Sequence, residues 1–420
     1  MSNGRRVFIA GGALTPFIGK GHPDFIWKKH PDFGTKENPT LEMLLQHAVD
    51  GAIQETGLDP EQVDRLYIGN FVGELFCNQG HLGAALAGTN PAFANKPAAR
   101  LEGACASGGL AFLAGVDAIR AGEDTVLVAG VEVQTTQSAR VGADYLARAS
   151  HYRRQRDIDE FTFPALFARR TQAYRAAFGV SEEDIGHVAV KAYGNANKNP
   201  LAHMKARKMT IDVAGSANER NPCFLANEEL HPYIKMSDCS QVSDGAAALV
   251  LVSEQGLAKL GISEADCVEV AGVGHSVASL YTDGDLTRLT TTADAAAKAY
   301  RSAGITAQDV NVAEVHDCFA VTELMMIEAI GLAAPGQGAE LTKSGATAID
   351  GATPVNTGGG LIGFGHPVGA TGIKQPLEIF RQMKGQCGDY QVSGDLLWGA
   401  TANMGGDDKT VVSLALKNLG

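Results

Sequence analysis

The sequence predicts an α/β protein built from two similar halves, with a polar insertion in the first half. Three observations lead to this prediction. Apolar strand patterns alternate with helical patterns in the first 130 residues, the same alternation returns after residue 240, and residues 130–239 are more polar than either part. The chain has 420 residues, about two to three times the usual domain length, so we expect more than one hydrophobic core.

The expected elements follow one another in βαβ order. Short apolar runs predict strands at 7–10, 66–68, 125–129, 312–315 and 410–416. Amphipathic patterns predict helices over 41–56, 107–121, 293–303 and 373–383. Strands that alternate with helices in this way form parallel sheets covered by helices.

A short internal repeat supports the two halves. Residues 52–68 align without gaps with residues 299–315, and three of the 17 positions are identical. So few identities are weak evidence alone, but the matching order of elements strengthens them. We therefore expect an N-terminal half of residues 1–129 plus 240–262, an inserted domain of residues 130–239 and a C-terminal half of residues 263–420.

Composition excludes several classes of protein. The 35 basic against 47 acidic residues give a formal charge of -12, which argues against nucleic acid and anionic membranes as partners. We expect no membrane span, since no uncharged apolar run approaches about 20 residues. The seven cysteines are an odd number without a Cys-x-x-Cys pair, which indicates reduced thiols and a cytoplasmic location.

The first candidate for chemistry is Cys105, within the glycine-rich stretch 103–109. It comes just before the predicted helix 107–121, whose unpaired N–H groups and dipole would lower the thiol pKa and favour the thiolate. The Cys105 N–H could also contribute to an oxyanion hole. The alternative is an unreactive cysteine buried as a small apolar side chain.

A second group follows the predicted strand 312–315, at the strand end where α/β proteins place ligands. His316 and Cys318 could both act as acid or base there. A metal site is less favoured, because no second pair of ligands follows at zinc-like spacing. A buried structural pair is the other alternative.

The third stretch, residues 356–372, has seven glycines in 17 residues. Such density indicates tight turns or close contact between backbone and ligand. His366 in this stretch could be a general base or an oxyanion donor, although a phosphate-binding loop would also explain the glycines. Residues 403–406 could supply further oxyanion N–H groups or form a plain turn.

A basic stretch lies in the expected insertion. Residues 191–211 contain no acidic residue but include Lys205, Arg207 and Lys208, which indicates a site for a phosphorylated ligand. A solvated helix face is an equally good explanation. The tetrapeptide His-Pro-Asp-Phe occurs at 22–25 and again at 30–33, and we expect residues 18–39 to form an ordered surface loop.

In this order, the four motifs resemble the thiolase superfamily, and the resemblance covers nearly the whole chain. It implies two βαβαβαββ halves in a five-layered α-β-α-β-α sandwich, with a loop domain inserted in the first half. It also implies a homodimer or homotetramer.

The resemblance carries catalytic roles residue by residue. Cys105 matches the nucleophile that becomes acylated, and His366 matches the histidine that activates it. Other thiolases have Asn-Glu-Ala-Phe and a second cysteine in a Cys-x-Gly motif, where this chain has His316-Asp-Cys-Phe and Asn-Met-Gly405. That combination is similar to the sterol carrier protein type of thiolase. The similarity implies that Cys318 is the second catalytic cysteine. It also implies that His316 helps to hold a water molecule in one oxyanion hole, and that the Gly405 N–H belongs to the other.

The resemblance also implies the ligand. Ser240 matches a serine near the pantetheine of coenzyme A, and Lys205, Arg207 and Lys208 lie in the region that would meet its phosphates. Coenzyme A is then a substrate, and no cofactor or metal is expected. The implied reaction is thiolytic cleavage of a 3-ketoacyl-CoA or the reverse Claisen condensation through an acyl-cysteine.

Three other functions stay open. One is a condensing enzyme of the ketoacyl synthase kind that uses acyl carrier protein, and the intact Cys318 argues against it. Another is a carbon–carbon lyase of the thiolase fold, but the members that resemble aldolases lack the nucleophile. The third is a noncatalytic acyl-CoA binding subunit, which would not need the reactive residues. Acyl chain length and the direction of the reaction do not follow from the sequence.

Overall fold

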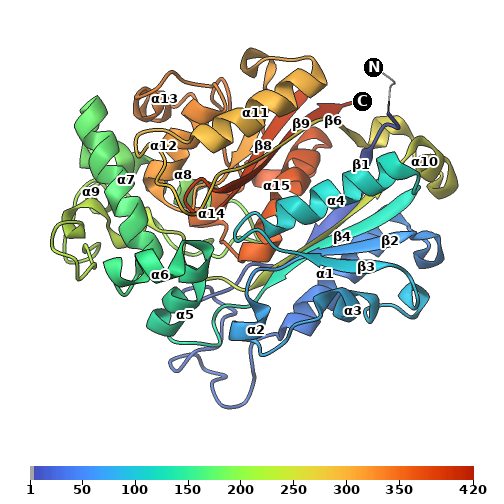
Figure 1. The fold of residues 1–420 in the computed structure, drawn as a ribbon, viewed down its shortest axis with the longest axis horizontal. Coiled ribbons are helices and arrows are strands. Elements are labelled where there is room, and N and C mark those ends of the chain that lie inside the picture. Colours follow the sequence, from blue (N-terminus) through green and yellow to red (C-terminus); the bar gives the residue numbers. More distant parts are fainter. Residues whose placement is uncertain (1–3) are drawn as a thin grey trace.

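A computed structural model describes residues 4–420 (Figure 1). Nine strands form one hydrogen-bonded sheet in the order β3-β2-β4-β5-β1-β6-β9-β8-β7. The strands are β1 (Phe8–Leu14), β2 (Arg65–Gly69), β3 (Ala98–Leu101), β4 (Thr125–Glu132), β5 (Gly245–Val252), β6 (Val268–Val277), β7 (Val312–Val315), β8 (Trp398–Gly405) and β9 (Thr410–Asn418).

The sheet consists of two parts that meet at one seam. Strands β1 to β5 form the first part and β6 to β9 the second. At the seam, β1 and β6 share two residue pairs, Phe8 with Glu269 and Ile9 with Val268. By contrast, β6 and β9 are paired along nine residues of β9. The two parts can therefore turn away from each other and enclose a layer of helices.

Helices lie on both sides of each part of the sheet (Figure 1). The helix α1 (Leu41–Thr56) covers the first part and α11 (Thr290–Ala303) covers the second. Between the two parts lie α4 (Ser107–Ala121) and α15 (Val368–Met383), which pack against each other. This arrangement confirms the α/β fold and its five layers.

The helix α4 is apolar enough to be tested as a membrane span. Residues 104–121 meet the length and composition of such a segment, but 61% of them are buried inside the protein. In the structure α4 packs against α15, β2 and β4. Its apolar character is that of a core helix between two sheets.

The internal repeat has the same local structure in both copies. The helix α1 ends at Gly57 with φ 64°, and α11 ends at Gly304 with φ 72°. Glycine adopts this left-handed conformation without steric cost. A 3-10 turn follows in each copy, at Pro60–Gln62 and Ala307–Asp309, and then β2 or β7 begins. The constant spacing seen in the sequence is therefore a spacing between equivalent elements.

The two halves differ at their third strand. The first half has the full βαβαβαββ order, with β3 beside β2. In the second half, no strand within residues 4–420 takes the equivalent place beside β7. Val355 forms only a single bridge with Ala313 of β7 there. Pro354 lacks an N–H group, and Asn356 has a left-handed φ of 56°, so the chain leaves the sheet after one residue.

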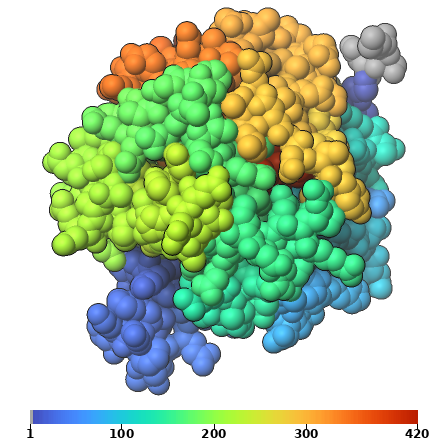
Figure 2. Space-filling view, turned by 60° about the vertical axis from the view of Figure 1, so that its left-hand side comes forward, coloured from blue at the N-terminus to red at the C-terminus, as the bar shows by residue number. Residues whose placement is uncertain are grey.

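The segment between β4 and β5 is helical and irregular. It includes α5 (Ala139–Leu146), α7 (Thr162–Phe178) and α8 (Glu182–Ala196), and Figure 2 shows it in green and yellow-green across one face. The helix α8 packs against α12 (Ala320–Ala329) and the short α14 (Gly360–Gly363) of the second half. This segment therefore joins the two halves on the side where their loops meet.

Candidate active site

Cys105 lies in a tight turn at the start of α4. Ala104 has a left-handed φ of 53°, which costs about 1–2 kcal/mol in a residue with a side chain. The Ser107 hydroxyl offsets this cost by donating to the Ala104 carbonyl at 2.6 Å and accepting from the Gly103 N–H at 3.1 Å. The turn holds Cys105 in one position just before the first residue of α4.

Glycines bring α4 and α15 into backbone contact. A Cβ atom on Gly372 would lie 2.0 Å from the Gly109 nitrogen, and one on Gly108 would lie 2.6 Å from the Gly369 oxygen. Because Cys105 and His366 lie just before these two helices, the contact brings them together. Of the seven glycines in residues 356–372, Gly369 and Gly372 thus serve helix packing, while Gly359, Gly360 and Gly365 adopt positive φ values of 115°, 61° and 120°.

The structure brings the predicted residues of both halves together. The Cys105 sulfur and an imidazole nitrogen from each of His316 and His366 all lie within 4.8 Å of one another. The two imidazole rings meet edge to face, with centroids 4.9 Å apart. Cys318 and Ser240 line the same cavity, of about 360 Å³. A thiol and two imidazoles at this spacing could also bind a metal, so the absence of a metal stays a prediction.

The contacts of His366 leave one ring nitrogen free. Its Nδ1 lies 2.7 Å from the Thr371 hydroxyl, which itself lies 3.2 Å from the Pro367 carbonyl, its acceptor one helical turn back. With that hydroxyl donating to the carbonyl, His366 Nδ1 carries the proton and donates to Thr371. His366 Nε2 is buried without a partner in the described residues. Burial lowers the pKa of His366 to about 3, so the imidazole is neutral and Nε2 can accept a proton.

His316 has the opposite arrangement. The Asn403 side-chain oxygen accepts from the Gly109 N–H at 3.1 Å, so its nitrogen points the other way. That nitrogen donates to the Cys105 carbonyl at 3.1 Å and lies 3.4 Å from His316 Nδ1. His316 Nδ1 therefore accepts, and Nε2 carries the proton. Burial and the neighbouring His366 hold the pKa of His316 well below its usual value, so this ring is a neutral hydrogen-bond donor.

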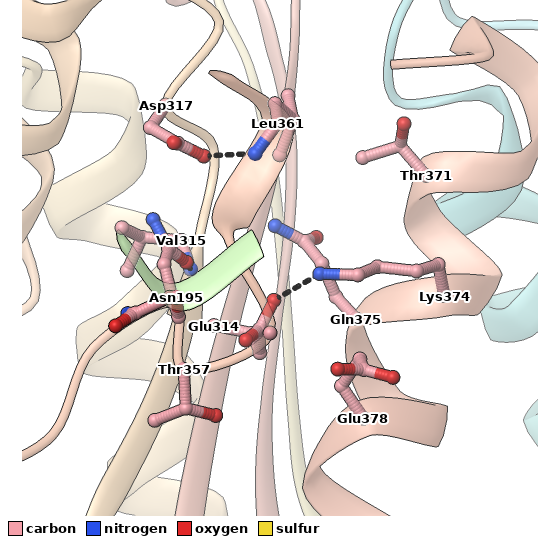
Figure 3. A network of polar contacts seen from close by, with 12 residues as sticks. Asn195, Glu314, Val315, Asp317, Thr357, Leu361, Thr371, Lys374, Gln375 and Glu378 are labelled. Atoms are coloured by element: carbon pink, nitrogen blue, oxygen red, sulfur yellow. Dashed lines mark hydrogen bonds and ion pairs between the residues drawn. The ribbon is translucent and has the colours of Figure 1, made fainter. Parts of the chain in front are cut away.

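Asp317 links the two loops that carry the histidines. It is fully buried, and its carboxylate accepts from the N–H groups of Leu361 at 2.6 Å and Ile362 at 3.3 Å (Figure 3). Burial raises the pKa of this carboxyl group. Nearby, Lys374 of α15 donates to Glu314 of β7 at 2.6 Å (Figure 3). The Asp317 contacts fasten the His316 loop to the segment that leads to His366, and the Lys374–Glu314 pair fastens β7 to α15.

Burial of the Cys105 thiol opposes the lowered pKa that its place before the helix predicts. Cys105 opens on the cavity, but the cavity walls are apolar, and burial raises the pKa of the thiol to about 12. The Gly406 N–H favours the thiolate without outweighing burial. Since proximity to a helix start does not reveal desolvation, the sequence could not show this balance.

Two neighbouring glycines of the 403–406 stretch have different surroundings, and the role of the Gly405 N–H stays a prediction. Gly406 lines the cavity and its N–H faces the Cys105 thiol, whereas Gly405 is absent from the cavity lining within residues 4–420. A Cβ atom on Gly405 would lie 2.1 Å from the Gly103 carbonyl oxygen, so its place is in the packing behind the Cys105 turn.

The basic residues of the insertion lie away from this cavity. None of Lys205, Arg207 and Lys208 is part of its lining in the described residues. Lys205 donates to the Pro200 carbonyl at 3.1 Å and lies 4.0 Å from Asp24 of the 18–39 loop. Arg207 and Lys208 are exposed. The structure thus places Ser240 with the catalytic candidates and the three basic residues elsewhere.

Three contributors were not predicted in these roles, namely Thr371, Asn403 and Asp317. Asn403 and Asp317 act through contacts with residues far away in the sequence, and Thr371 acts through its hydrogen bond to His366 in the same stretch. One signal was present for Asn403, because it occupies the position where other thiolases have their second cysteine.

Comparison with known proteins agrees with this geometry. Residues 31–255 match the model for the thiolase N-terminal domain, and residues 272–418 match that for the thiolase C-terminal domain-like family. An acetyl-CoA acetyltransferase of Methanothermobacter thermautotrophicus is 34% identical over 86% of this chain and 90% of its own. The benzoylsuccinyl-CoA thiolase subunit BbsB of Thauera aromatica is 29% identical over 92% and 91%. Human sterol carrier protein 2 is 27% identical over 93% of this chain and 68% of its own.

Solved structures share the fold at lower identity. The Ltp2-ChsH2(DUF35) aldolase has a TM-score of 0.76 at 22% identity, covering 98% of each chain. An acetyl-CoA acetyltransferase from Syntrophomonas wolfei has a TM-score of 0.69 at 18% identity, covering 99% of this chain and 100% of its own. With both family models matched along the chain, the protein belongs to the thiolase family and is an acyl-CoA acyltransferase.

Proposed function

We propose that this enzyme cleaves 3-ketoacyl-CoA with coenzyme A, or runs the reverse Claisen condensation, through an acyl group on Cys105. The observation that carries the proposal is the juxtaposition of the Cys105 thiol with the His366 imidazole, whose Nε2 has no other partner in the described residues. Such a pair is a nucleophile with its general base.

The first step acylates Cys105. His366 Nε2 takes the thiol proton as the sulfur attacks the 3-keto carbon, and a negative charge develops on the keto oxygen. Two hydrogen-bond donors are available to that oxygen, His316 Nε2–H and the N–H of Gly406. When the oxyanion collapses, the bond between C2 and C3 breaks, and its electron pair stays on the acetyl-CoA carbon.

Cys318 completes the cleavage. Burial holds the pKa of its thiol well above the usual value, so it is a proton donor in the resting enzyme. It protonates the acetyl-CoA carbanion and becomes a thiolate. This thiolate then takes the proton of free coenzyme A, whose sulfur attacks the acyl-Cys105 carbonyl and releases the shortened acyl-CoA, while Cys105 recovers its proton from His366. In the condensation direction the same thiolate removes the proton from acetyl-CoA.

The relatives support acetyl-CoA as one of the reactants, since two archaeal relatives bear the name acetyl-CoA acetyltransferase. Coenzyme A is the substrate, and we assign its phosphates to the exposed basic group of Lys205, Arg207 and Lys208. A homodimer or homotetramer and a cytoplasmic location are part of the same proposal, supported by the family and by the unpaired cysteines.

A structural neighbour named as an aldolase raises a second candidate function, carbon–carbon lysis without an acyl-enzyme. Cys105 beside a free imidazole favours acyl transfer over it. The deciding measurement is the intact mass after incubation with acetyl-CoA or acetoacetyl-CoA, followed by peptide mapping. We expect an acetyl group on Cys105 that free coenzyme A removes. Absence of an adduct with every acyl-CoA donor would refute the proposal.

A further inference from the structure

The groups around Cys105 define which acyl chain the enzyme can carry, because the acyl group is covalently bound to this sulfur. Cys105 packs against a hydrophobic cluster that contains Phe71, Ala149 and Val368, with Leu146 and Phe163 against it. All five of these side chains also line the cavity. Any acyl group on Cys105 therefore lies among aromatic and aliphatic side chains.

The wall has no partner for a charged acyl group. Within residues 4–420, no Asp, Glu, Lys or Arg lines the cavity. The amide nitrogen of Gln134 already donates to the carbonyls of Ser243 and His366, each at 2.9 Å. The remaining polar groups are the catalytic candidates and residues 240–241. The Ser240 N–H donates to the Cys318 carbonyl, and the Gln241 amide nitrogen already donates to the carbonyls of Met236 and Cys239. A carboxylate buried here would meet no cation among the described lining residues, which is strongly unfavourable.

One face of α5 leaves space beside this wall. Ala139, Ala143 and Leu146 lie at helical spacing and line the cavity, while Val141 is on another face and is 38% exposed. Two alanines on the lining face leave room that a larger side chain would fill. Further from Cys105, the rings of Phe167 and Phe319 stack at 4.5 Å, so the aromatic wall continues past Cys318.

From these observations we propose that the acyl group carried by Cys105 is uncharged, apolar and longer than acetyl, with Ala143 on α5 limiting its size. This inference rests on the proposed function and adds its substrate class. A 3-ketoacyl-CoA of medium chain length is cleaved better than acetoacetyl-CoA, and one with a terminal carboxylate is cleaved poorly.

The test compares kcat/KM for thiolysis of 3-ketoacyl-CoA substrates of four to ten carbons. Each added methylene that is buried should raise kcat/KM by up to about fourfold, so we expect at least about a tenfold gain from four to eight carbons. The charged probe is 3-oxoadipyl-CoA, which we expect to react at least about 100-fold more slowly than 3-oxohexanoyl-CoA, its uncharged six-carbon counterpart.

The variant Ala143→Phe should lower the ratio of ten-carbon to four-carbon kcat/KM by at least about 30-fold, because its ring occupies the chain's space. Val141→Phe, on the exposed face of the same helix, is the matched control and should leave the ratio unchanged. Ala143→Leu replaces Ala143→Phe if the larger ring prevents folding, as judged by thermal unfolding.

Two outcomes would overturn the inference, namely a preference for acetoacetyl-CoA in the wild type or an unchanged chain-length ratio in the Ala143 variants. Competition between acetyl-CoA and octanoyl-CoA for Cys105, read by intact mass, separates this inference from the proposed function. Preferential acetylation contradicts only the chain length, whereas no adduct from either donor contradicts acyl transfer itself.

Discussion

The carboxyl ends of β2 and β7 are equivalent places in the two halves, yet they have different tasks. After β2, the Asn70 side chain accepts from the Gly73 N–H at 3.0 Å and donates to the Val131 carbonyl at 2.8 Å. After β7, the residue equivalent to Asn70 is Asp317, which bonds to the segment leading to His366. His316, the residue before it, lies beside Cys105. The first half uses this strand end to hold its own loops, and the second half uses it for chemistry.

The starts of α4 and α15 show the complementary difference. Both helices lie in the central layer, and the residue near the start of each points to the same cavity. The first half contributes the thiol of Cys105, and the second contributes the imidazole of His366. A repeated scaffold thus provides equivalent positions, and the site exists only where the positions of the two halves differ.

The largest effect is expected from replacing the two cysteines, Cys105 of the first half and Cys318 of the second. Cys105→Ala should abolish acylation, a loss of more than about 10⁴-fold, because no nucleophile remains. Cys318→Ala should still form the acyl-enzyme from acetyl-CoA but lose carbon–carbon cleavage and condensation. Intact mass and steady-state thiolysis measure the two steps separately. If acylation were lost in both variants, the division of roles between the halves would be wrong.

The histidine tautomers offer the next test. Asn403→Ala removes the donor to His316 Nδ1, and we expect kcat to fall by about 10²-fold, as for loss of an oriented oxyanion donor. Thr371→Val should weaken the base in a similar way, while Thr371→Ser keeps the hydroxyl and should restore most of the activity. Nitrogen NMR of labelled histidine reads the tautomers directly. Identical tautomers in His316 and His366 would contradict the arrangement described above.

The glycine contact between α4 and α15 can be broken without touching a catalytic side chain. Gly372→Ala should lower the free energy of unfolding by about 1–3 kcal/mol, as expected for overpacking, and should move His366 away from Cys105. Gly194→Ala is the control, because a Cβ atom there meets nothing within 4 Å and α8 should gain about 0.5–1 kcal/mol. Urea unfolding gives both values. Equal effects at the two sites would show that close helix packing is not required.

A last prediction concerns the pH dependence of stability and the inserted segment, without any effect on the catalytic residues. Burial lowers the pKa of His203 to about 4, and this ring bonds to the Ser243 hydroxyl at 2.9 Å. The unfolded chain binds a proton here below about pH 6.5, whereas the folded chain does so only below about pH 4. Stability should therefore decrease as pH falls through this window, by up to about 3 kcal/mol from this group. In His203→Asn the free energy of unfolding should depend less steeply on pH between about 6.5 and 4. An unchanged slope would show that His203 is not the cause of this dependence.

Much of the fold could be predicted, because local patterns determine much of it. The helix over 41–56, the helix over 107–121 and the strand at 312–315 have the predicted boundaries in the structure. The helix α15 begins five residues before the expected 373, since Gly369 and Gly372 weaken the helical pattern. Their presence follows from contact with α4, which no local pattern reveals.

The site was predictable where a residue type reports its chemistry. Cys105, His316, Cys318, His366 and Ser240 are all part of one cavity, as the motifs suggested. What the sequence could not show is which ring nitrogen is free, which glycine N–H faces the sulfur, and whether the thiol is ionised. Each depends on contacts between segments that are distant in the chain and on burial, and the basic residues 205–208 show that charge clustering alone does not place a residue in a cavity.

The backbone contact between α4 and α15 has an evolutionary consequence. Two identical copies of one ancestral half, meeting through the same helix, would present the same residue from both sides of the contact. A thiol would then face a thiol, or an imidazole would face an imidazole. Because both halves belong to one chain, the two helix starts are encoded separately and can differ, so a nucleophile can lie opposite a base of a different kind.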